Sequence, residues 1–360
     1  MNIEAFRARR AHLMQTMAER GGGVAIHLTA PERVRSRDTE YPYRFDSHFW
    51  YLTGFGEPGA ALVLVVRDGV GKAILLCRPR DPERETWDGF RYGPAAAREV
   101  FGFDEAYSID ELDRLAPEWL ADAPVLHCDL SAGSEFDARV QRWLTVVRGR
   151  VRSGVQAPAT VTDLLAPIDE MRLLKQADEI EHMRRAAQIS AAAHARAMHS
   201  CRAGMREYEL EAEILHEFRR RGSAAPAYGS IVAAGANACV LHYPAGDTEL
   251  ANGDLCLIDA GCEIEGYAAD ITRTFPVSGR FSAEQRAVYE IVFDAQRAAI
   301  DRIAPGADFD APHEAATRVL TQGMIDLGLL SGSVDGALES GAFRQFYMHR
   351  TGHWIGLDVH

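Results

Sequence analysis

The chain has 360 residues, 47% of them hydrophobic and 25% charged, which is typical of a soluble globular protein with room for two or three domains. With 52 acidic against 39 basic residues its formal net charge is −13, which disfavours nucleic acid as a partner because little basic charge is left to neutralise phosphates. The longest apolar run, residues 59–66, is too short to cross a bilayer, so we expect no membrane segment.

Six cysteines are scattered singly along the chain, at positions 77, 128, 201, 239, 256 and 262, without a CxxC pair. This pattern indicates reduced thiols in a cytoplasmic protein rather than a disulfide framework or a zinc knuckle. Residues 1–17 are amphipathic and rich in arginine, and they lack the apolar core of a secretory signal.

Residues 1–165 have the pattern of an α/β domain. The expected helices are 3–20, 94–101, 109–120 and 134–147, and the expected buried strands are 24–28, 60–66, 72–77 and 124–128. In the aromatic-rich stretch RSRDTEYPYRFDSHFWYLTGF, Trp50 and Tyr51 predict the start of a strand. The residues before them form either an ordinary loop over the core or a lip that faces an interface or a substrate. Trp87 has the same two interpretations.

The second domain is expected to span residues 166–360, after a connection rich in proline and threonine at 154–167. Its expected helices are 176–201, 207–220, 282–303 and 312–327, and Ser282 with Gln285 forms a capping box. The stripe predicted to face the core on the first of these helices contains Ile180, Met183, Ala187, Ala191, His194 and Met198, and His194 is predicted to be a core residue. The order of helices and strands suggests a half-repeat whose second copy is incomplete at residue 360.

The stretch 254–276, DLCLIDAGCEIEGYAADITRTFP, predicts a β-hairpin with a two-residue turn at 265–266, where a glycine accepts positive φ. In that register Asp259 lies opposite Thr272, so Asp259 and Asp270 share one face of the hairpin. Two carboxylates roughly 7–8 Å apart on a half-buried face repel each other, which favours a divalent cation between them. The alternative is that they are ordinary solvent-facing aspartates. Cys256 and Cys262 fall on the opposite face, as packing residues.

Three histidines, His349, His353 and His360, lie in the stretch YMHRTGHWIGLDVH. Histidines clustered beside glycines and aromatic residues indicate a functional site more than a packed core. His349 and His353 have the spacing of a zincin pair, but no glutamate follows His349 and Gly352 disfavours a helix. The zincin interpretation therefore fails.

The segments LIDAGCEIEGYAADITRTFPV, NACVLHYP and HRTGHWIGLDVH together resemble the pita-bread metallopeptidases and, within them, the aminopeptidase P family. The resemblance extends into the first domain and covers nearly the whole chain. It implies a creatinase-type α/β N-terminal domain followed by an α+β pita-bread catalytic domain.

The resemblance also implies the residues of the site. The implied metal ligands are Asp259, Asp270 and His353, with Asp270 bridging two ions. The histidines implied to contact the substrate or line the cleft are His242, His360 and His349. The candidate substrate-pocket residues are Tyr228, Trp87 and Asp38. Two glutamate ligands are expected beyond residue 360, so we expect the chain to be a fragment of a longer protein, the alternative being a truncated and defective protein.

The implied activity is release of the first residue from peptides that begin Xaa-Pro, by a hydroxide that bridges two divalent ions. Carboxylate-rich coordination favours manganese, with cobalt, zinc or iron as alternatives. Prolidase, which takes only dipeptides, is the second enzyme interpretation, and a methionyl aminopeptidase is less favoured because its minimal form lacks such an N-terminal domain. A non-catalytic peptide-binding protein is the alternative from another class. The family implies a homodimer or homotetramer, with Asp38 and Trp87 as candidates for contributing to a neighbouring site.

Overall fold

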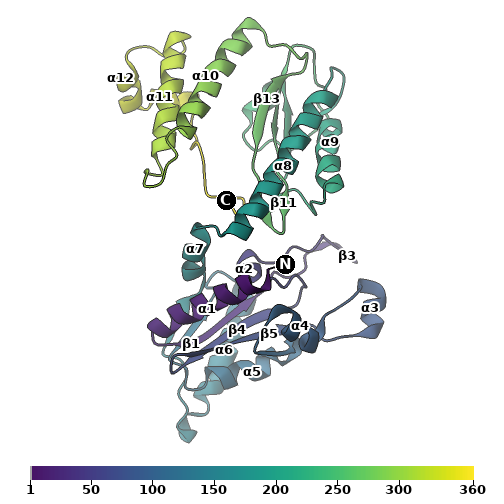
Figure 1. Ribbon diagram of the computed structural model, residues 1–360, viewed down its shortest axis with the longest axis vertical. Helices are drawn as coiled ribbons and strands as arrows, with labels where there is room; N and C mark the ends of the chain where they lie inside the picture. The colour runs from purple at the N-terminus through teal and green to yellow at the C-terminus, as the bar shows by residue number, and fades with distance from the viewer. Residues whose placement is uncertain (1) are drawn as a thin grey trace. The chain divides into compact units, whose positions relative to one another are not determined.

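The computed structural model describes residues 2–360, which form two compact units that divide between Asp178 and Glu179 (Figure 1). The division lies later along the chain than the expected boundary after residue 165. The helix that follows that boundary belongs to the first unit, because Tyr51 Oη donates to the carbonyl of Met171 at 3.1 Å and His48 Nε2 lies 2.7 Å from Asp169 Oδ1.

A six-stranded mixed sheet forms the centre of the first unit, in the order β6-β5-β4-β1-β7-β8. Its strands are β1 (Gly23–Leu28), β4 (Ala61–Arg67), β5 (Val70–Cys77), β6 (Glu105–Ser108), β7 (Val125–Cys128) and β8 (Thr160–Asp163). The pairs β1–β4 and β4–β5 are antiparallel, and β1–β7, β5–β6 and β7–β8 are parallel. A separate small ribbon pairs β2 (Val34–Ser36) with β3 (Thr39–Glu40).

Helices cover both faces of this sheet (Figure 1). The helices of the first unit are α1 (Ile3–Glu19), α2 (Ser47–Thr53), α3 (Pro82–Asp88), α4 (Gly93–Phe101), α5 (Leu112–Leu120), α6 (Ser134–Arg148) and α7 (Leu165–Leu173), and α3 has no buried residue and does not belong to the layers on the sheet. Strand residues such as Val63 and Ile74 pack with Trp143 and other side chains of α5 and α6. The alternate residues Leu62 and Leu64 are also buried, so the sheet is apolar on both faces, as expected for a sheet between helical layers.

Two predictions for this unit were wrong. Trp50 and Tyr51 lie in a helix, α2, because Asp46 accepts a hydrogen bond from the backbone N–H of Phe49 and Gly54 ends the helix in the left-handed conformation. The predicted connection 154–167 contains β8, which pairs as a parallel edge strand with β7.

The second unit contains a three-stranded antiparallel sheet, β13-β10-β9, formed by β9 (Ile231–Ala234), β10 (Leu255–Asp259) and β13 (Thr272–Pro276). A short ribbon of β11 (Glu263–Ile264) and β12 (Tyr267–Ala268) completes the hairpin. Helices α8 (Ala177–Ser200) and α9 (Glu207–Arg220) pack on this sheet through a shared core. The remaining helices are α10 (Ala283–Ile300), α11 (Ala311–Asp326) and α12 (Val334–Ser340).

The predicted core stripe of α8 was wrong except at His194 and, in part, at Met183, which is half-buried. Ile180 and Met198 are exposed, whereas the side chains that face the core include Ala186, Ile189 and Ala193. Small side chains are what allow the helix to approach the sheet closely, so the buried face is set by alanines rather than by the largest apolar residues. His194 is 3% exposed and its Nε2 lies 3.0 Å from the carbonyl oxygen of Ala260, which confirms it as a core residue.

Candidate metal centre

The predicted hairpin places the two aspartates. Asp259 pairs with Thr272 and Ile264 with Tyr267, which is the predicted register, and the turn at 265–266 has positive φ at both positions. Between the two ladders, the chains approach so closely that a Cβ on Gly261 would lie 1.7 Å from the carbonyl oxygen of Ala269. The register is the same in both ladders, so no extra residue between them turns Asp270 to the other face.

Asp259 and Asp270 meet at one hydroxyl. Tyr228 Oη lies 2.5 Å from Asp259 Oδ1 and 2.9 Å from Asp270 Oδ1. Burial raises the pKa of the Asp259 carboxyl. The hydrogen bond from Tyr228 lowers this pKa in part, and the negative charge of Asp270 raises it further. Burial and the hydrogen bond to Asp259 also raise the pKa of the Tyr228 phenol. Asp259 is therefore a partly desolvated carboxyl beside a second carboxylate, which is the setting that a cation relieves.

His353 approaches Asp270 from a distant part of the chain. Its Nδ1 lies 2.7 Å from the carbonyl oxygen of Trp354, which can only accept, so Nδ1 carries the proton. In the neutral ring Nε2 then presents a lone pair, and it lies 3.0 Å from Asp270 Oδ2. An imidazole nitrogen that faces a carboxylate oxygen, on a ring oriented by a backbone carbonyl, is the arrangement that metal-binding histidines adopt.

His360 completes a group of three donors. Asp270, His353 and His360 each offer one ligand atom, and these atoms lie within 4.8 Å of one another. The rings of His353 and His360 are 4.4 Å apart between centroids. Asp259 is outside this group of three but joins it through Tyr228 and Asp270. The residues present therefore fit a divalent ion, with mixed carboxylate and imidazole ligands.

A cavity of about 500 Å³ adjoins these residues. Its lining combines the candidate metal ligands with aromatic and small side chains: Glu211, Tyr228, Gly229, Ser230, Ile231, His242, Tyr243, Pro244, Ala245, Asp259, Asp270 and His360. Its size suits a short peptide or a small ligand. The structure thus brings together five of the predicted residues, Asp259, Asp270, Tyr228, His242 and His360, and His353 contacts them through Asp270.

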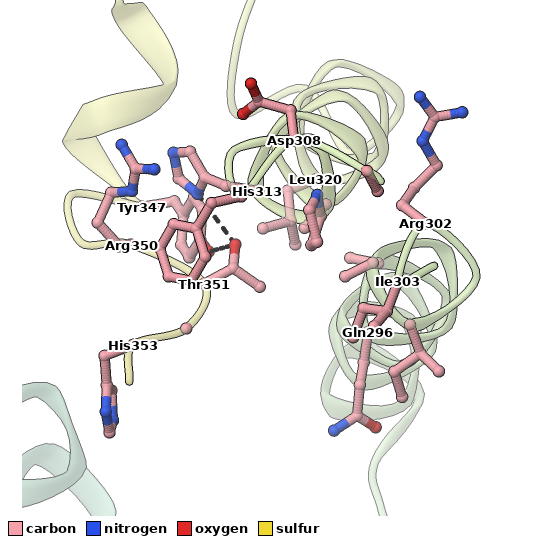
Figure 2. Close-up of a pocket in the computed structure, with 18 of the residues that line it drawn as sticks. Gln296, Arg302, Ile303, Asp308, His313, Leu320, Tyr347, Arg350, Thr351 and His353 are labelled. Atoms are coloured by element: carbon pink, nitrogen blue, oxygen red, sulfur yellow. Dashed lines mark hydrogen bonds between the residues drawn. The ribbon is translucent and has the colours of Figure 1, made fainter. Parts of the chain in front are cut away.

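A second cavity, of about 610 Å³, lies between α10, α11 and residues 347–353 (Figure 2). In it Thr351 Oγ1 lies 2.9 Å from His313 Nδ1 and 2.6 Å from Tyr347 Oη. Figure 2 shows His353 at the edge of this cavity, apart from these three side chains. The contacts of Thr351 anchor the segment that carries His353 to α11.

Three other predicted residues lie apart from the first cavity or in the other unit. His349 is exposed, and its Nδ1 lies 2.8 Å from the carbonyl oxygen of Arg350. Asp38 is exposed in the turn between β2 and β3, and Trp87, on α3, is 81% exposed. Their assignment to a substrate cleft stays a prediction.

Two glutamates on α9 were not predicted from the sequence as functional residues. Glu211 lines the first cavity, and burial raises the pKa of its carboxyl. Glu207, one turn earlier, is completely buried and accepts hydrogen bonds from the loop that follows β9. Their four-residue spacing at the start of a predicted helix was the available signal, but such spacing is common on solvated helix faces.

Comparisons with known proteins agree with this geometry. Residues 181–360 match the model of metallopeptidase family M24, and residues 6–127 match the aminopeptidase P N-terminal domain. The chain belongs to metallopeptidase family M24, and both the predicted enzyme class and the two-part fold are confirmed.

Within that family the similar proteins are Xaa-Pro aminopeptidases. The chain is 44% identical to the one from Haemophilus influenzae, over 99% of this chain and 80% of the relative, and 43% identical to the one from Escherichia coli, over 99% and 81%. Pseudomonas aeruginosa aminopeptidase PepP superposes with a TM-score of 0.97 at 48% identity, over 100% of this chain and 81% of that one. Zinc-substituted E. coli aminopeptidase P in complex with product superposes with a TM-score of 0.96 at 42% identity, over 100% and 82%.

Among residues 2–360, no helix combines the length and apolar composition that would let it cross a membrane.

Proposed function

We propose that this protein is a metal-dependent aminopeptidase that releases the first residue from peptides beginning Xaa-Pro. The observation that carries the proposal is the convergence of Asp270 with Tyr228, His353 and His360 beside a cavity of peptide size. The relatives that bear the name Xaa-Pro aminopeptidase, at 43–44% identity over almost the whole chain, support it.

The metal ligands in this proposal are Asp259, Asp270 and His353. When bound, two divalent ions would polarise the scissile carbonyl and make hydroxide available near neutral pH. Oxygen-rich coordination favours manganese over metals that prefer thiolate. The hydrogen bond from His353 Nδ1 to the Trp354 carbonyl orients the ring so that Nε2 faces Asp270, where it can act as a ligand.

The residues implied to act on the peptide are His242, His360 and His349. His242 and His360 line the cavity, where a ring N–H can donate to the oxygen of the reacting carbonyl as negative charge develops on it. Tyr228, at the wall of the same cavity, positions the carboxylates through its hydroxyl. Trp87 and Asp38 are proposed as contributors from the first unit.

Selectivity for proline is implied by the family resemblance, and the names of the relatives support it. A proline in the second position has no backbone N–H. A site that needs this N–H as a donor rejects such peptides, whereas a site that binds the proline ring must work without this donor. We expect the full-length protein with manganese to cleave Arg-Pro-Pro much faster than Arg-Ala-Ala. Equal rates would remove the proline claim, and an Asp270→Asn variant, which should cleave neither peptide, controls for contaminating peptidases.

The same assay with Arg-Pro tests the prolidase interpretation, which the names of the relatives do not favour. An enzyme that cleaves the dipeptide and leaves the tripeptide intact would reverse our choice. A full-length protein that binds no stoichiometric divalent ion would instead point to a peptide-binding protein.

Three finer features complete the proposal. We infer two ions per site, because the family resemblance implies two glutamate ligands in addition to the residues named above. We infer a homodimer or homotetramer from the same resemblance. A cytoplasmic location is supported by the six cysteines at positions 77, 128, 201, 239, 256 and 262, all of which carry free thiols in the structure.

A further inference from the structure

Glu207 is a buried carboxylate with an unusual set of partners. Glu207 is the first residue of α9 and is 0% exposed. Oε1 accepts from the backbone N–H of Ala234 at 2.8 Å and from Asn237 Nδ2 at 3.0 Å. Oε2 accepts from Tyr243 Oη at 3.0 Å and from the backbone N–H of Gly246 at 3.1 Å. Burial of a carboxylate is costly unless its oxygens are fully hydrogen-bonded, and these four donors supply that compensation.

All four donors belong to one loop. The loop, taken as residues 234–246, begins with the last residue of β9 and includes His242, which lines the candidate substrate cavity. Glu207 bonds both ends of the loop, at Ala234 and Gly246, as well as two side chains within it. Val240, Leu241 and His242 themselves are exposed, so the buried contacts lie on either side of them in the sequence.

The side-chain contacts close into a ring. Asn237 Nδ2 lies 2.9 Å from Tyr243 Oη, whose own proton is donated to Glu207 Oε2, and 3.0 Å from Thr248 Oγ1. Gly246 leaves space for this ring, because a Cβ there would lie 2.9 Å from Tyr243 Oη and 3.2 Å from Glu207 Oε2. Tyr243 follows His242 directly, so fixing its ring restricts where the imidazole can lie.

We propose that Glu207 is a positioning residue that fixes the 234–246 loop and so holds His242 at the substrate cavity. The inference rests on the proposed function, because His242 is the group through which it would act on catalysis. Glu207 itself does not line the cavity as Glu211 does, and it acts through the loop rather than on the peptide.

Glu207→Gln tests this role with almost no change in size. The amide replaces one acceptor oxygen by an NH₂ group, which must face donors of the loop and cannot accept from them. We expect kcat for Arg-Pro-Pro to fall on the order of 10- to 100-fold, because a small displacement of a catalytic group has an effect of this size. KM should change much less, since the metal ligands are untouched.

Glu217→Gln is the matched control. Glu217 is buried on the same helix, but its partners are three arginines, Arg196, Arg220 and Arg221. This variant removes a buried charge from α9 without touching the loop. We expect it to lower thermal stability at least as much as Glu207→Gln does, and to leave kcat within about twofold, as for a site independent of the loop.

A double variant separates positioning from general damage. If Glu207 acts through His242, then Glu207→Gln should lower kcat by less than about twofold in a His242→Ala background. An equal loss in both backgrounds would overturn the inference. Tyr243→Phe removes one donor of the ring without altering a buried charge, so it provides the same test if Glu207→Gln fails to fold.

A spectroscopic measurement makes the test independent of activity. In protein labelled with ¹⁵N-histidine, the His242 signal can be assigned by its disappearance in His242→Ala. We expect it to broaden or shift in Glu207→Gln and Tyr243→Phe and to stay unchanged in Glu217→Gln. An unchanged signal in the first two variants would overturn the positioning role. Failure of the parent protein to cleave Arg-Pro-Pro would instead refute the proposed function and leave this measurement decisive.

Discussion

At the scale of single residues, the hydroxyl of Tyr228 controls the charge balance of the candidate metal centre. A phenol has one proton, so it can donate to only one of the two carboxylate oxygens that lie within 2.9 Å of it. The other contact brings oxygen lone pairs together unless a proton or a cation intervenes. The same hydroxyl thus lies between Asp259 and Asp270 without supplying the charge that would neutralise either of them.

Tyr228→Phe should therefore affect the metal-free protein most. Loss of a hydrogen bond to a charged group costs roughly 1.5–3 kcal/mol, and we expect this loss in the free energy of unfolding without metal. With manganese bound, the carboxylates are satisfied by the ions and the loss should be smaller. Urea denaturation with manganese and with chelator would measure both values. A loss of the same size in both conditions would contradict this role for Tyr228.

The residue scale also shows what sequence reasoning could not supply. The shared face of Asp259 and Asp270 was predictable because side chains alternate along a strand, and the turn at 265–266 set the register. The involvement of Glu207 was not predictable, because its four donors are brought to it only by tertiary packing. His349 and His353 are close in sequence and similar in composition, and only the fold separates the exposed one from the one that meets Asp270.

At the scale of secondary-structure elements, capping residues at the ends of a segment can outweigh the intrinsic helix or strand preference of the residues inside it. Trp50 and Tyr51 favour a strand by their intrinsic preference, but Asp46 and Gly54 supply both caps of a short helix. Strand β8 was missed because its TVTD sequence is short and polar and becomes a strand only by pairing with the edge of β7. The hairpin was predicted correctly because turn, alternation and register are all encoded within one continuous stretch.

The cap of α2 gives a prediction of pH dependence. Burial alone would raise the pKa of Asp46, but its hydrogen bond and charge interaction with His27 and the bond from Phe49 N–H outweigh this and lower the pKa to about 2. A carboxyl whose folded pKa lies below its unfolded value of 3.8 stabilises the protein above pH 3.8 and loses that contribution as pH falls through about 2.

Asp46→Asn should keep the helix cap and remove only the charge, because asparagine is also a good N-cap. We expect a loss of about 2 kcal/mol in the free energy of unfolding at pH 5 to 7. The difference from the parent protein should shrink from pH 4 towards pH 2. Urea denaturation across this range measures it, and a difference that stays constant with pH would show that the carboxylate charge is not responsible.

The close approach of Gly261 to Ala269 within the hairpin gives a second prediction at the scale of an element. In Gly261→Ala the new Cβ would meet the carbonyl oxygen of Ala269, which is backbone and cannot rotate away. We expect a loss of about 3 kcal/mol in the free energy of unfolding, at the upper end for overpacked positions, together with weaker metal binding. Gly229→Ala is the control, because its φ is not positive and no described atom lies within 4 Å of the added Cβ. Similar losses in both variants would contradict this explanation.

At the scale of the whole molecule, each of the two units has a large hydrophobic core of its own. The first contains residues such as Ile26, Val63 and Trp143 around the six-stranded sheet. The second contains residues such as Ile214 and Ile258 between α8, α9 and the sheet that carries the aspartates. The candidate metal ligands all lie in the second unit, so a bound ion should stabilise that unit specifically.

Calorimetry of the full-length protein should therefore show two unfolding transitions with different responses to metal. Manganese at about 100 times its dissociation constant should stabilise the second unit by about 2.7 kcal/mol, since an ion that binds only the folded state shifts the equilibrium by mass action. Asp46→Asn should lower the other transition, which identifies it as that of the first unit, and Asp270→Asn should abolish the metal response. A metal-induced rise of equal size in both transitions would mean that the two cores do not unfold as separate units.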